Sequence, residues 1–183
     1  DMDHLDAITA TGTDGGDITI STLSFDDLDN DGSTDNQVTV ILNATTAASK
    51  ITVSALATPN VADAKIDSLT LTGAGDIDMD DADMGANGAE ITILTAAELT
   101  GQLDLDIGDA TDAMVVTLGN AATGHTNTII TGAGNDVITG GTGADSITTG
   151  MGDDTITTGA GGINTISGGA GADAVDISQS SAT

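Results

Sequence analysis

The sequence predicts an all-β fold, a parallel β-helix or β-solenoid that ends in a segment of short glycine-rich repeats. Three observations favour this fold class. Between Thr131 and Ser178 the chain repeats itself about every nine residues, as TGAGNDVIT, GGTGADSIT, TGMGDDTIT, TGAGGINTIS and GGAGADAVD. Upstream of the repeats, short runs alternate apolar and polar residues, which is typical of half-buried strands. Helix signals are nearly absent, and only residues 95–99 (TAAEL) could form a single helical turn.

The nine-residue repeat keeps three features in register. Each unit begins with a glycine turn, and the sixth position is Asp in four of the five units. Two positions later stands one aliphatic residue, which we expect to be buried: Ile138, Ile147, Ile156, Ile166 and Val175. Glycine-rich nonapeptides of this kind are a sequence signature of calcium-binding parallel β-helices. The repeat therefore predicts both a solenoid and a calcium site.

Composition limits the kind of core and the kind of partner. The chain of 183 residues has 29 acidic residues against two lysines, Lys50 and Lys65, a formal net charge of -27. This charge excludes nucleic acid as a partner, because phosphates would be repelled. Phe25 is the one aromatic residue and cysteine is absent, so small aliphatic side chains must fill the core. Disorder is the alternative for an acidic, aromatic-poor chain, but the alternating apolar runs argue against it. No run is long and apolar enough for a membrane span.

Nine runs upstream of the repeats have the alternation expected of strands. We predict strands at residues 17–21, 37–43, 51–54, 68–72, 77–79, 90–94, 103–107, 114–118 and 128–131. Their centres lie roughly ten to sixteen residues apart beyond Ser68, and the spacing tightens to nine after Ile129. This change indicates a solenoid whose irregular rungs become regular toward the C-terminus.

The spacing also suggests how the chain is organised. We divide it into an N-terminal β region (residues 1–62), an irregular β-solenoid (63–130), the repeat segment (131–178) and a tail (179–183). For residues 1–62 two alternatives stay open, because the early strands are widely spaced. They are either further solenoid rungs or a separate small β-sandwich that ends near Pro59.

The repeat geometry predicts stacked carboxylates. If two nonapeptides complete one coil, residues eighteen apart lie above each other at the strand spacing of about 4.8 Å. Asp136, Asp154 and Asp173 then form one column, provided that the ten-residue fourth unit bulges, and Asp145 and Asn164 form the opposite column. Two carboxylates about 5 Å apart repel by roughly 1 kcal/mol in water and about 3 kcal/mol at an effective dielectric constant near 20. A cation must therefore lie between them.

Calcium fits this arrangement better than magnesium. It accepts six to eight oxygen ligands in flexible geometry, whereas magnesium requires a stricter octahedron and keeps its waters. The glycine turns leave room for backbone carbonyls to point inward. Because the few buried aliphatic side chains offset only part of the backbone entropy, we expect the repeat segment to be unfolded without Ca²⁺.

A second candidate calcium loop lies near the N-terminus, in the sequence DLDNDGSTD. It places carboxylates at loop positions 1, 3, 5 and 9, which are Asp27, Asp29, Asp31 and Asp35, and Gly32 at the sharp turn. Position 12 is Val38, so the bidentate Glu of an EF-hand is missing. The loop is more similar to the DxDxDGxxD calcium loops of extracellular β modules.

The remaining polar residues give weaker signals. Two acidic runs, residues 76–83 and 104–112, are predicted to be solvated solenoid faces, with an interfacial ion site as the alternative. His4 and His125 have no partners in a catalytic arrangement, and no set of Ser, His and Asp stands out. We therefore expect no enzyme within this chain.

Residues 131–178 resemble the RTX repeats of bacterial proteins exported by type I secretion. The resemblance implies a right-handed β-roll in which calcium ions are shared between successive coils. It also implies ligation by the sixth-position residues Asp136, Asp145, Asp154 and Asp173, with Asn164 as a neutral departure. The other implied ligands are carbonyls of the glycine turns, at Gly132, Gly134, Gly141, Gly143, Gly150, Gly152, Gly159, Gly161, Gly169 and Gly171.

Residues 96–136 are similar in style to the Thr-, Ala- and Gly-rich solenoid arms of proteobacterial S-layer proteins, which also carry RTX repeats. This resemblance implies a calcium-binding structural protein of an extracellular bacterial surface layer. Its partners would be copies of itself in a lattice or filament, and cell-surface polysaccharide is a further candidate. The alternative is an RTX module of a larger secreted adhesin, toxin or enzyme. The start at Asp1, without a basic and apolar leader, favours a processed product or a fragment.

Overall fold

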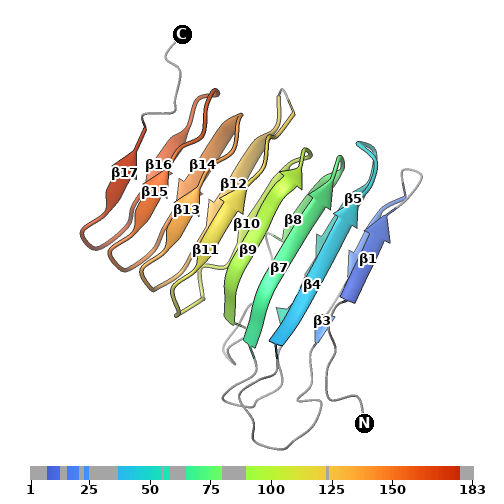
Figure 1. The fold of residues 1–183 in the computed structure, drawn as a ribbon, viewed down its shortest axis with the longest axis horizontal. Coiled ribbons are helices and arrows are strands. Elements are labelled where there is room, and N and C mark those ends of the chain that lie inside the picture. The colour runs from blue at the N-terminus through green and yellow to red at the C-terminus, as the bar shows by residue number, and fades with distance from the viewer. Residues whose placement is uncertain are drawn as a thin grey trace, which may run out of the picture.

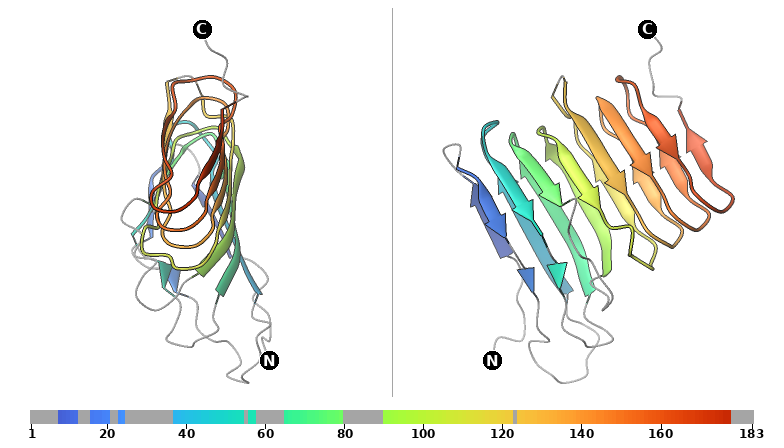
Figure 2. Two further views of the ribbon diagram at one scale, coloured as in Figure 1. Left: turned by 90° about the vertical axis from the view of Figure 1, so that its left-hand side faces the viewer. Right: turned by 180° about the vertical axis from the view of Figure 1, so that it is seen from behind.

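The computed structural model describes residues 8–12, 16–20, 23–24, 37–54, 56–57, 65–79, 90–122 and 124–177. Within these ranges the secondary structure consists of strands and turns, which confirms the predicted all-β fold class. The strands stack side by side along the long axis of the molecule, in chain order from β1 to β17 (Figure 1). Seen from the end, the chain winds as a flattened loop (Figure 2). In these ranges no helix is long and apolar enough to cross a membrane.

Two parallel sheets form the long sides of this solenoid. Sheet A contains β1 (Ile8–Gly12), β4 (Gln37–Ala44), β7 (Lys65–Gly73), β9 (Glu90–Leu99), β11 (Val115–Leu118), β13 (Val137–Thr139), β15 (Thr155–Thr157) and β17 (Ala174–Asp176). Sheet B contains β2 (Ile18–Ile20), β5 (Lys50–Val53), β8 (Asp76–Met79), β10 (Leu103–Asp106), β12 (Thr126–Ile130), β14 (Ala144–Thr148) and β16 (Thr165–Ser167). A separate short pair joins β3 (Leu23–Ser24) to β6 (Leu56–Ala57).

The chain alternates between the two sheets, so each coil contributes one strand to each of them. In the repeat segment Val137 pairs with Thr155, and Asn127 pairs with Asp145. These partners are eighteen residues apart, so two nonapeptides complete one coil, as the sequence predicts. Partners on either side of the ten-residue fourth unit are nineteen residues apart. The fold class is a β-solenoid that ends in a β-roll of short rungs.

The core lies between the sheets, where alternate side chains of every strand point inward. One inward column in sheet A runs through Val40, Leu69, Leu94, Val116, Ile138 and Ile156, each at most 1% exposed. Leu, Ile, Val and Met supply almost all of the buried volume, since the chain has almost no aromatic residues. The prediction of a core built from small aliphatic side chains is confirmed.

Two of the repeat aliphatics depart from the predicted burial. Ile138, Ile147 and Ile156 are buried, but Ile166 is only partly buried and Val175 is 46% exposed. The reason is position and not residue type. Both lie in the last strands of their sheets, and among the described residues no further coil covers them.

The predicted helical turn at residues 95–99 is wrong, because these residues belong to β9. Neighbouring strands β7 and β11 bond to both edges of β9, which satisfies its backbone within the sheet. Ala96 and Leu99 are buried in the core. Tertiary pairing thus overrides the local helix preference of Ala and Leu. Strands β1, β3 and β6 were not predicted.

In the N-terminal region, the strands belong to the same two parallel sheets as the later rungs. β1 pairs with β4, and β4 pairs with β7, all in parallel. On the other side β2 pairs with β5, and β5 pairs with β8. Each sheet therefore contains strands from before and from after position 62. The same holds for position 130.

The close spacing of coils makes the glycine turns sensitive to any added side chain. A Cβ at Gly141 would overlap the carbonyl oxygen of Gly119 in the preceding coil, although the backbone of Gly141 is not left-handed. We predict that Gly141→Ala lowers the free energy of unfolding by about 1–3 kcal/mol, because the coils would have to separate. Urea unfolding in millimolar Ca²⁺, followed by circular dichroism, measures this change.

Gly108→Ala is the matched control for this substitution. A Cβ at Gly108 would lie 3.2 Å from Asp106 Oδ1 and 3.5 Å from Ile130 Cγ2, so little needs to move. We expect a small change of either sign, since alanine also restricts the unfolded chain. Equal midpoints for the two variants would contradict the tight stacking of the turns.

Candidate metal site

The sixth-position residues of the repeats lie where the chain enters each strand. Three of them lie directly before the first residue of a strand of sheet A: Asp136 before β13, Asp154 before β15 and Asp173 before β17. Asp145 and Asn164 occupy the equivalent places at β14 and β16 in sheet B. The carboxylates of Asp136, Asp145 and Asp154 are buried, each residue being 1% exposed. Asn164 and Asp173, in the last coil, are half-buried.

On the sheet A side, each of these carboxylates accepts a hydrogen bond from the backbone of the preceding coil. The N–H of Met114 donates to Asp136 Oδ1 at 2.8 Å, and the N–H of Asp136 donates to Asp154 Oδ1 at 2.8 Å. The N–H of Asp154 in turn donates to Asp173 Oδ1 at 3.1 Å. The last step spans nineteen residues instead of eighteen, so the extra residue of the fourth unit does not break the column. We call this set the acidic column.

The sheet B side carries a second column with less charge. The N–H of Leu103 donates to Asn127 Oδ1 at 3.0 Å, and Asn127 Nδ2 donates to Asp145 Oδ1 at 3.0 Å. The N–H of Asp145 donates to Asn164 Oδ1 at 2.9 Å. Here one carboxylate lies between two amides, and we call this set the mixed column. Asn127 was not predicted as part of the site, although its spacing of eighteen residues from Asp145 could have identified it.

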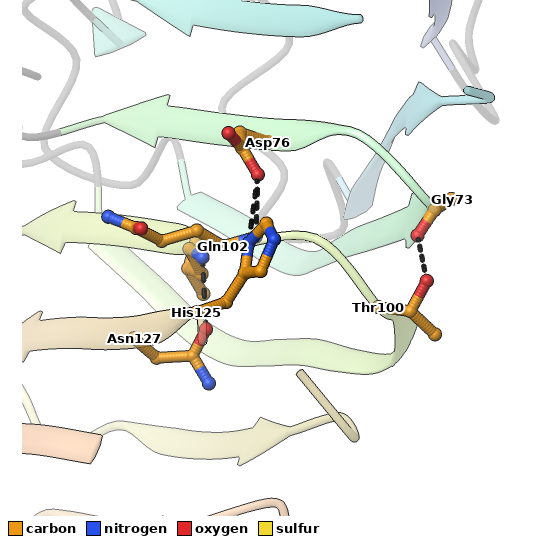
Figure 3. Close-up of polar contacts among 7 residues, drawn as sticks. Gly73, Asp76, Thr100, Gln102, His125 and Asn127 are labelled. Carbon is orange, nitrogen blue, oxygen red and sulfur yellow. Dashed lines mark hydrogen bonds and ion pairs between the residues drawn. The ribbon is translucent and has the colours of Figure 1, made fainter. Parts of the chain in front are cut away.

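Related side-chain contacts continue into the coils that precede the repeats (Figure 3). Asp76 Oδ1 accepts the N–H of Gln102 at 2.8 Å, in the coil that also bonds to Asn127. His125 Nδ1 lies 3.4 Å from the same oxygen of Asp76, and the two form an ion pair when the imidazole is protonated. Asp76 lies one register position before the mixed column, because Leu103 pairs with Ile77, and its carboxylate bonds to the following coil.

A third series lies on the surface, one residue before the acidic column. The N–H of Asp153 donates to Asn135 Oδ1 at 2.9 Å, and the N–H of Ala172 donates to Asp153 Oδ1 at 2.8 Å. Fifth-position side chains therefore bond to the following coil, whereas sixth-position side chains bond to the preceding coil. Asp153 and Asp154 are adjacent residues with the same charge, but the first is exposed and the second is buried.

The second carboxylate oxygen of each buried Asp has no hydrogen-bond partner. This holds for Oδ2 of Asp136, Asp145 and Asp154. A buried polar atom without a partner is costly, and a charged one costs more. A cation beside these oxygens would supply the missing interaction. The donor chemistry therefore fits a hard divalent ion such as Ca²⁺.

The first position of the repeat lies close to the Oδ2 atom of the sixth-position carboxylate. A Cβ at Gly140 would lie 2.9 Å from Asp145 Oδ2, and a Cβ at Gly168 would lie 2.5 Å from Asp173 Oδ2. In the first unit this position is Thr131, whose hydroxyl is also buried without a partner of hydrogen-bond geometry. The first and sixth residues of a unit are thus close neighbours in space.

The electrostatics agree with a requirement for a countercharge. Burial raises the pKa of Asp136, and the Asp154 carboxylate raises it further, while the Thr131 hydroxyl and the Met114 N–H lower it. Burial also raises the pKa of Asp145, and its bond to Asn127 lowers it. In the absence of a cation, the fold therefore disfavours the charged forms of both side chains.

The glycines of the turns have two distinct places. The second-position glycines stack on one another: a Cβ at Gly150 would overlap the carbonyl oxygen of Gly132, and a Cβ at Gly169 would overlap that of Gly150. Gly141 and Gly159 stack in the same way in the other turn. The fourth-position glycines have left-handed backbone, with positive φ: Gly134, Gly143, Gly152, Gly161 and Gly171. Both sets leave the turn carbonyls close to the next coil.

Among the described residues, no three acidic or histidine side chains converge on one point. A cation between coils would therefore have fewer than three of these side chains within reach among the described residues. The other acidic runs do not form a cluster of three either, as far as the structure describes them. The predicted loop of Asp27, Asp29, Asp31 and Asp35 lies outside the described residues.

The raised carboxyl pKa values predict how the metal-free chain responds to pH. A carboxyl group whose pKa is raised by folding stabilises the fold when protonated. This contribution is complete below the ordinary value of 3.8 and is lost as the pH rises through the folded-state pKa. In a chelator the repeat segment is expected to be largely unfolded near pH 7, and its β-structure and melting temperature should therefore increase as the pH falls toward 4.

Two variants separate this effect from the general loss of negative charge on acidification. Asp136→Asn keeps the Oδ1 acceptor for Met114 but cannot titrate, so its melting temperature should depend less on pH. Asp153→Asn removes one exposed charge and should keep the dependence of the natural chain. A metal-free chain that is more stable at pH 7 than at pH 4 would contradict this account.

Comparison with known proteins identifies the repeats. Residues 122–156 and 158–176 match the family model of the RTX calcium-binding nonapeptide repeat, in four copies. Searches of curated proteins and of solved structures each found no match. RTX repeats are typical of secreted proteins, and they bind Ca²⁺ at several sites. The C-terminal coils of this chain are therefore calcium-binding repeats of the RTX family, with Ca²⁺ ions as their cofactor.

Proposed function

We propose that the chain is a structural part of an extracellular bacterial surface layer, which folds on Ca²⁺ and assembles with copies of itself. The observation that carries the calcium part is the set of three buried carboxylates whose Oδ2 atoms have no partner. The layer part is supported by the extended solenoid, whose two sheets and regular rungs present long surfaces for repeated contacts. A structural role, and not a catalytic one, is proposed because the chemistry of the site is that of ion binding.

Within this proposal, the acidic column would bind calcium more tightly than the mixed column. Its carboxylates follow one another in three successive coils, at Asp136, Asp154 and Asp173. In the mixed column, Asp145 lies between Asn127 and Asn164, and Asn164 Nδ2 is buried without an acceptor. Calcium affinity increases with the number of charged ligands. Ion binding would tie each coil to the next, so metal affinity serves as folding energy.

The adjacent pair Asp153 and Asp154 tests which carboxylates bind the ion. Both Asp154→Asn and Asp153→Asn remove one charge and keep an oxygen that can accept the existing backbone hydrogen bond. We expect Asp154→Asn to raise the calcium concentration at half-saturation about tenfold or more, because it removes a buried anionic ligand. Asp153→Asn should raise it less than about threefold, as expected for an exposed charge. Isothermal titration calorimetry provides both values.

If Asp153→Asn weakened calcium binding as much as Asp154→Asn, the sixth-position column would not be the site. Circular dichroism at saturating Ca²⁺ checks that both variants reach the same β-structure. This control separates a loss of ion affinity from a general loss of folding.

The dependence of folding on calcium should differ along the chain. Coils from β4 to β11 are filled by large aliphatic side chains such as Leu42, Leu71 and Leu105, whereas each strand of the repeats buries a single Ile or less. In EGTA, we therefore expect residues 131–177 to exchange their amide hydrogens rapidly, while the strands β4, β5 and β7 to β11 stay protected. Hydrogen exchange measured by mass spectrometry, with and without millimolar Ca²⁺, distinguishes the two segments. Equal protection of residues 131–177 in both conditions would contradict metal-dependent folding.

The second candidate function is a calcium-dependent RTX module of a larger secreted adhesin, toxin or enzyme. The limited extent of the family match favours this candidate, because the match covers only the repeats. The repeats themselves would occur in either kind of protein. The two candidates share the fold and the ion sites. They differ in self-assembly: a layer protein forms extended arrays in millimolar Ca²⁺ under the electron microscope, whereas a module stays dispersed. Binding to glycans or to cell surfaces without array formation would favour the adhesin.

A further inference from the structure

The outer face of sheet A carries two columns of uncharged side chains. In one column, five threonines and one isoleucine lie in register on successive strands: Ile41, Thr70, Thr95, Thr117, Thr139 and Thr157. The other column is more apolar and contains Ser68, Ile93, Val115, Val137 and Thr155. We call these two columns the neutral face.

The centre of the neutral face exposes apolar surface. Ile93, Val115 and Val137 are 46%, 43% and 41% exposed, and they are direct neighbours across three strands. Isolated exposed aliphatic residues are ordinary, but three in one row form a continuous stripe. The outer face of sheet B differs at β8 and β10, where Asp78 pairs with Asp104 and the acidic side chains of Asp76 and Asp106 lie nearby. Its following strands carry Thr128, Ser146 and Thr165 in the same column.

We propose that the neutral face is the surface on which a second copy of this chain docks. This inference rests on the proposed self-assembly and names its contact. The formal charge of -27 makes two copies repel each other, so contact is least unfavourable where charge is absent. None of the residues of the neutral face is charged, and the next residue of the threonine column, on β17, is Asp176. A cationic partner would instead be attracted to the acidic side chains on the outer face of sheet B.

The regular spacing of the strands also favours a second copy over an unrelated partner. Side chains of the neutral face repeat at the strand spacing of about 4.8 Å. The same face of a second molecule, related by a two-fold axis, has the same repeat, so ridges of one copy match grooves of the other over many rungs. An unrelated protein has no such spacing unless it is itself a solenoid or a stacked sheet.

The size of the face indicates a weak contact. Six strands, from β4 to β15, make it about 25 Å long. This is short for a standard protein interface, so a single pair of molecules would associate weakly and an array would gain stability by repetition. The test must therefore use high protein concentrations or trap the contact.

Cross-linking offers such a trap, because the chain contains no cysteine. Val115→Cys introduces a single thiol at the centre of the neutral face, and Ser146→Cys introduces one on the outer side of sheet B as the matched control. In millimolar Ca²⁺ under oxidising conditions, we expect Val115→Cys to form disulfide-linked dimers at least five times faster than Ser146→Cys. Equal rates would overturn the inference.

Sedimentation velocity on the full chain in millimolar Ca²⁺ provides the second measurement. Val115→Glu places a charge in the apolar stripe and should raise the concentration at half-association about tenfold or more, whereas Thr128→Glu on sheet B should change it less than about threefold. Circular dichroism and melting temperature confirm that each variant folds. If the natural chain assembles and Val115→Glu assembles equally well, the docking face is wrong while the proposed layer function stands. If the natural chain stays monomeric up to millimolar concentration, both the face and the proposed self-assembly are overturned.

Discussion

The structure depends on the distance between successive coils and on what that distance imposes on acidic side chains. At a spacing of about 4.8 Å, residues in the same position of neighbouring coils must contact each other. A carboxylate in such a position uses Oδ1 to accept a backbone N–H from the preceding coil, as Asp154 does for Asp136. Its Oδ2 is then left buried without a partner. The hydrogen bond positions the charge, and the charge in turn requires a cation.

The period of the sequence contains enough information to predict the solenoid and its columns. Nine-residue units that pair give an eighteen-residue register, and this places Asp136 below Asp154. The extra residue of the ten-residue fourth unit lengthens the register to nineteen, and this places Asp145 below Asn164. Period-two alternation located most upstream strands, because a strand with one buried face must alternate. Which turn carbonyls could bind a metal ion follows less directly from the sequence, since the position of a carbonyl oxygen depends on backbone geometry and not on residue type.

The features that the sequence did not predict all depend on neighbours in space. Residues 95–99 have helix-forming side chains but lie between two strands that pair with their backbone. Val175 has the same place in its unit as Ile156, yet it is exposed because the described coils end there. Asn127 precedes the first complete unit and lacks a charge, so a search for acidic residues passes over it, although it donates a hydrogen bond to Asp145.

The first residues of the two columns are anchored in coils that have no calcium repeat. Met114 provides the N–H for Asp136, and Leu103 provides the N–H for Asn127, and both donors belong to residues buried in the aliphatic core. The apolar coils thus serve as a template on which the first acidic coil is laid, and each completed coil becomes the template for its successor. If the coils form in this order, growth of the solenoid has a direction, from β11 toward β17, and it begins on coils filled by aliphatic side chains.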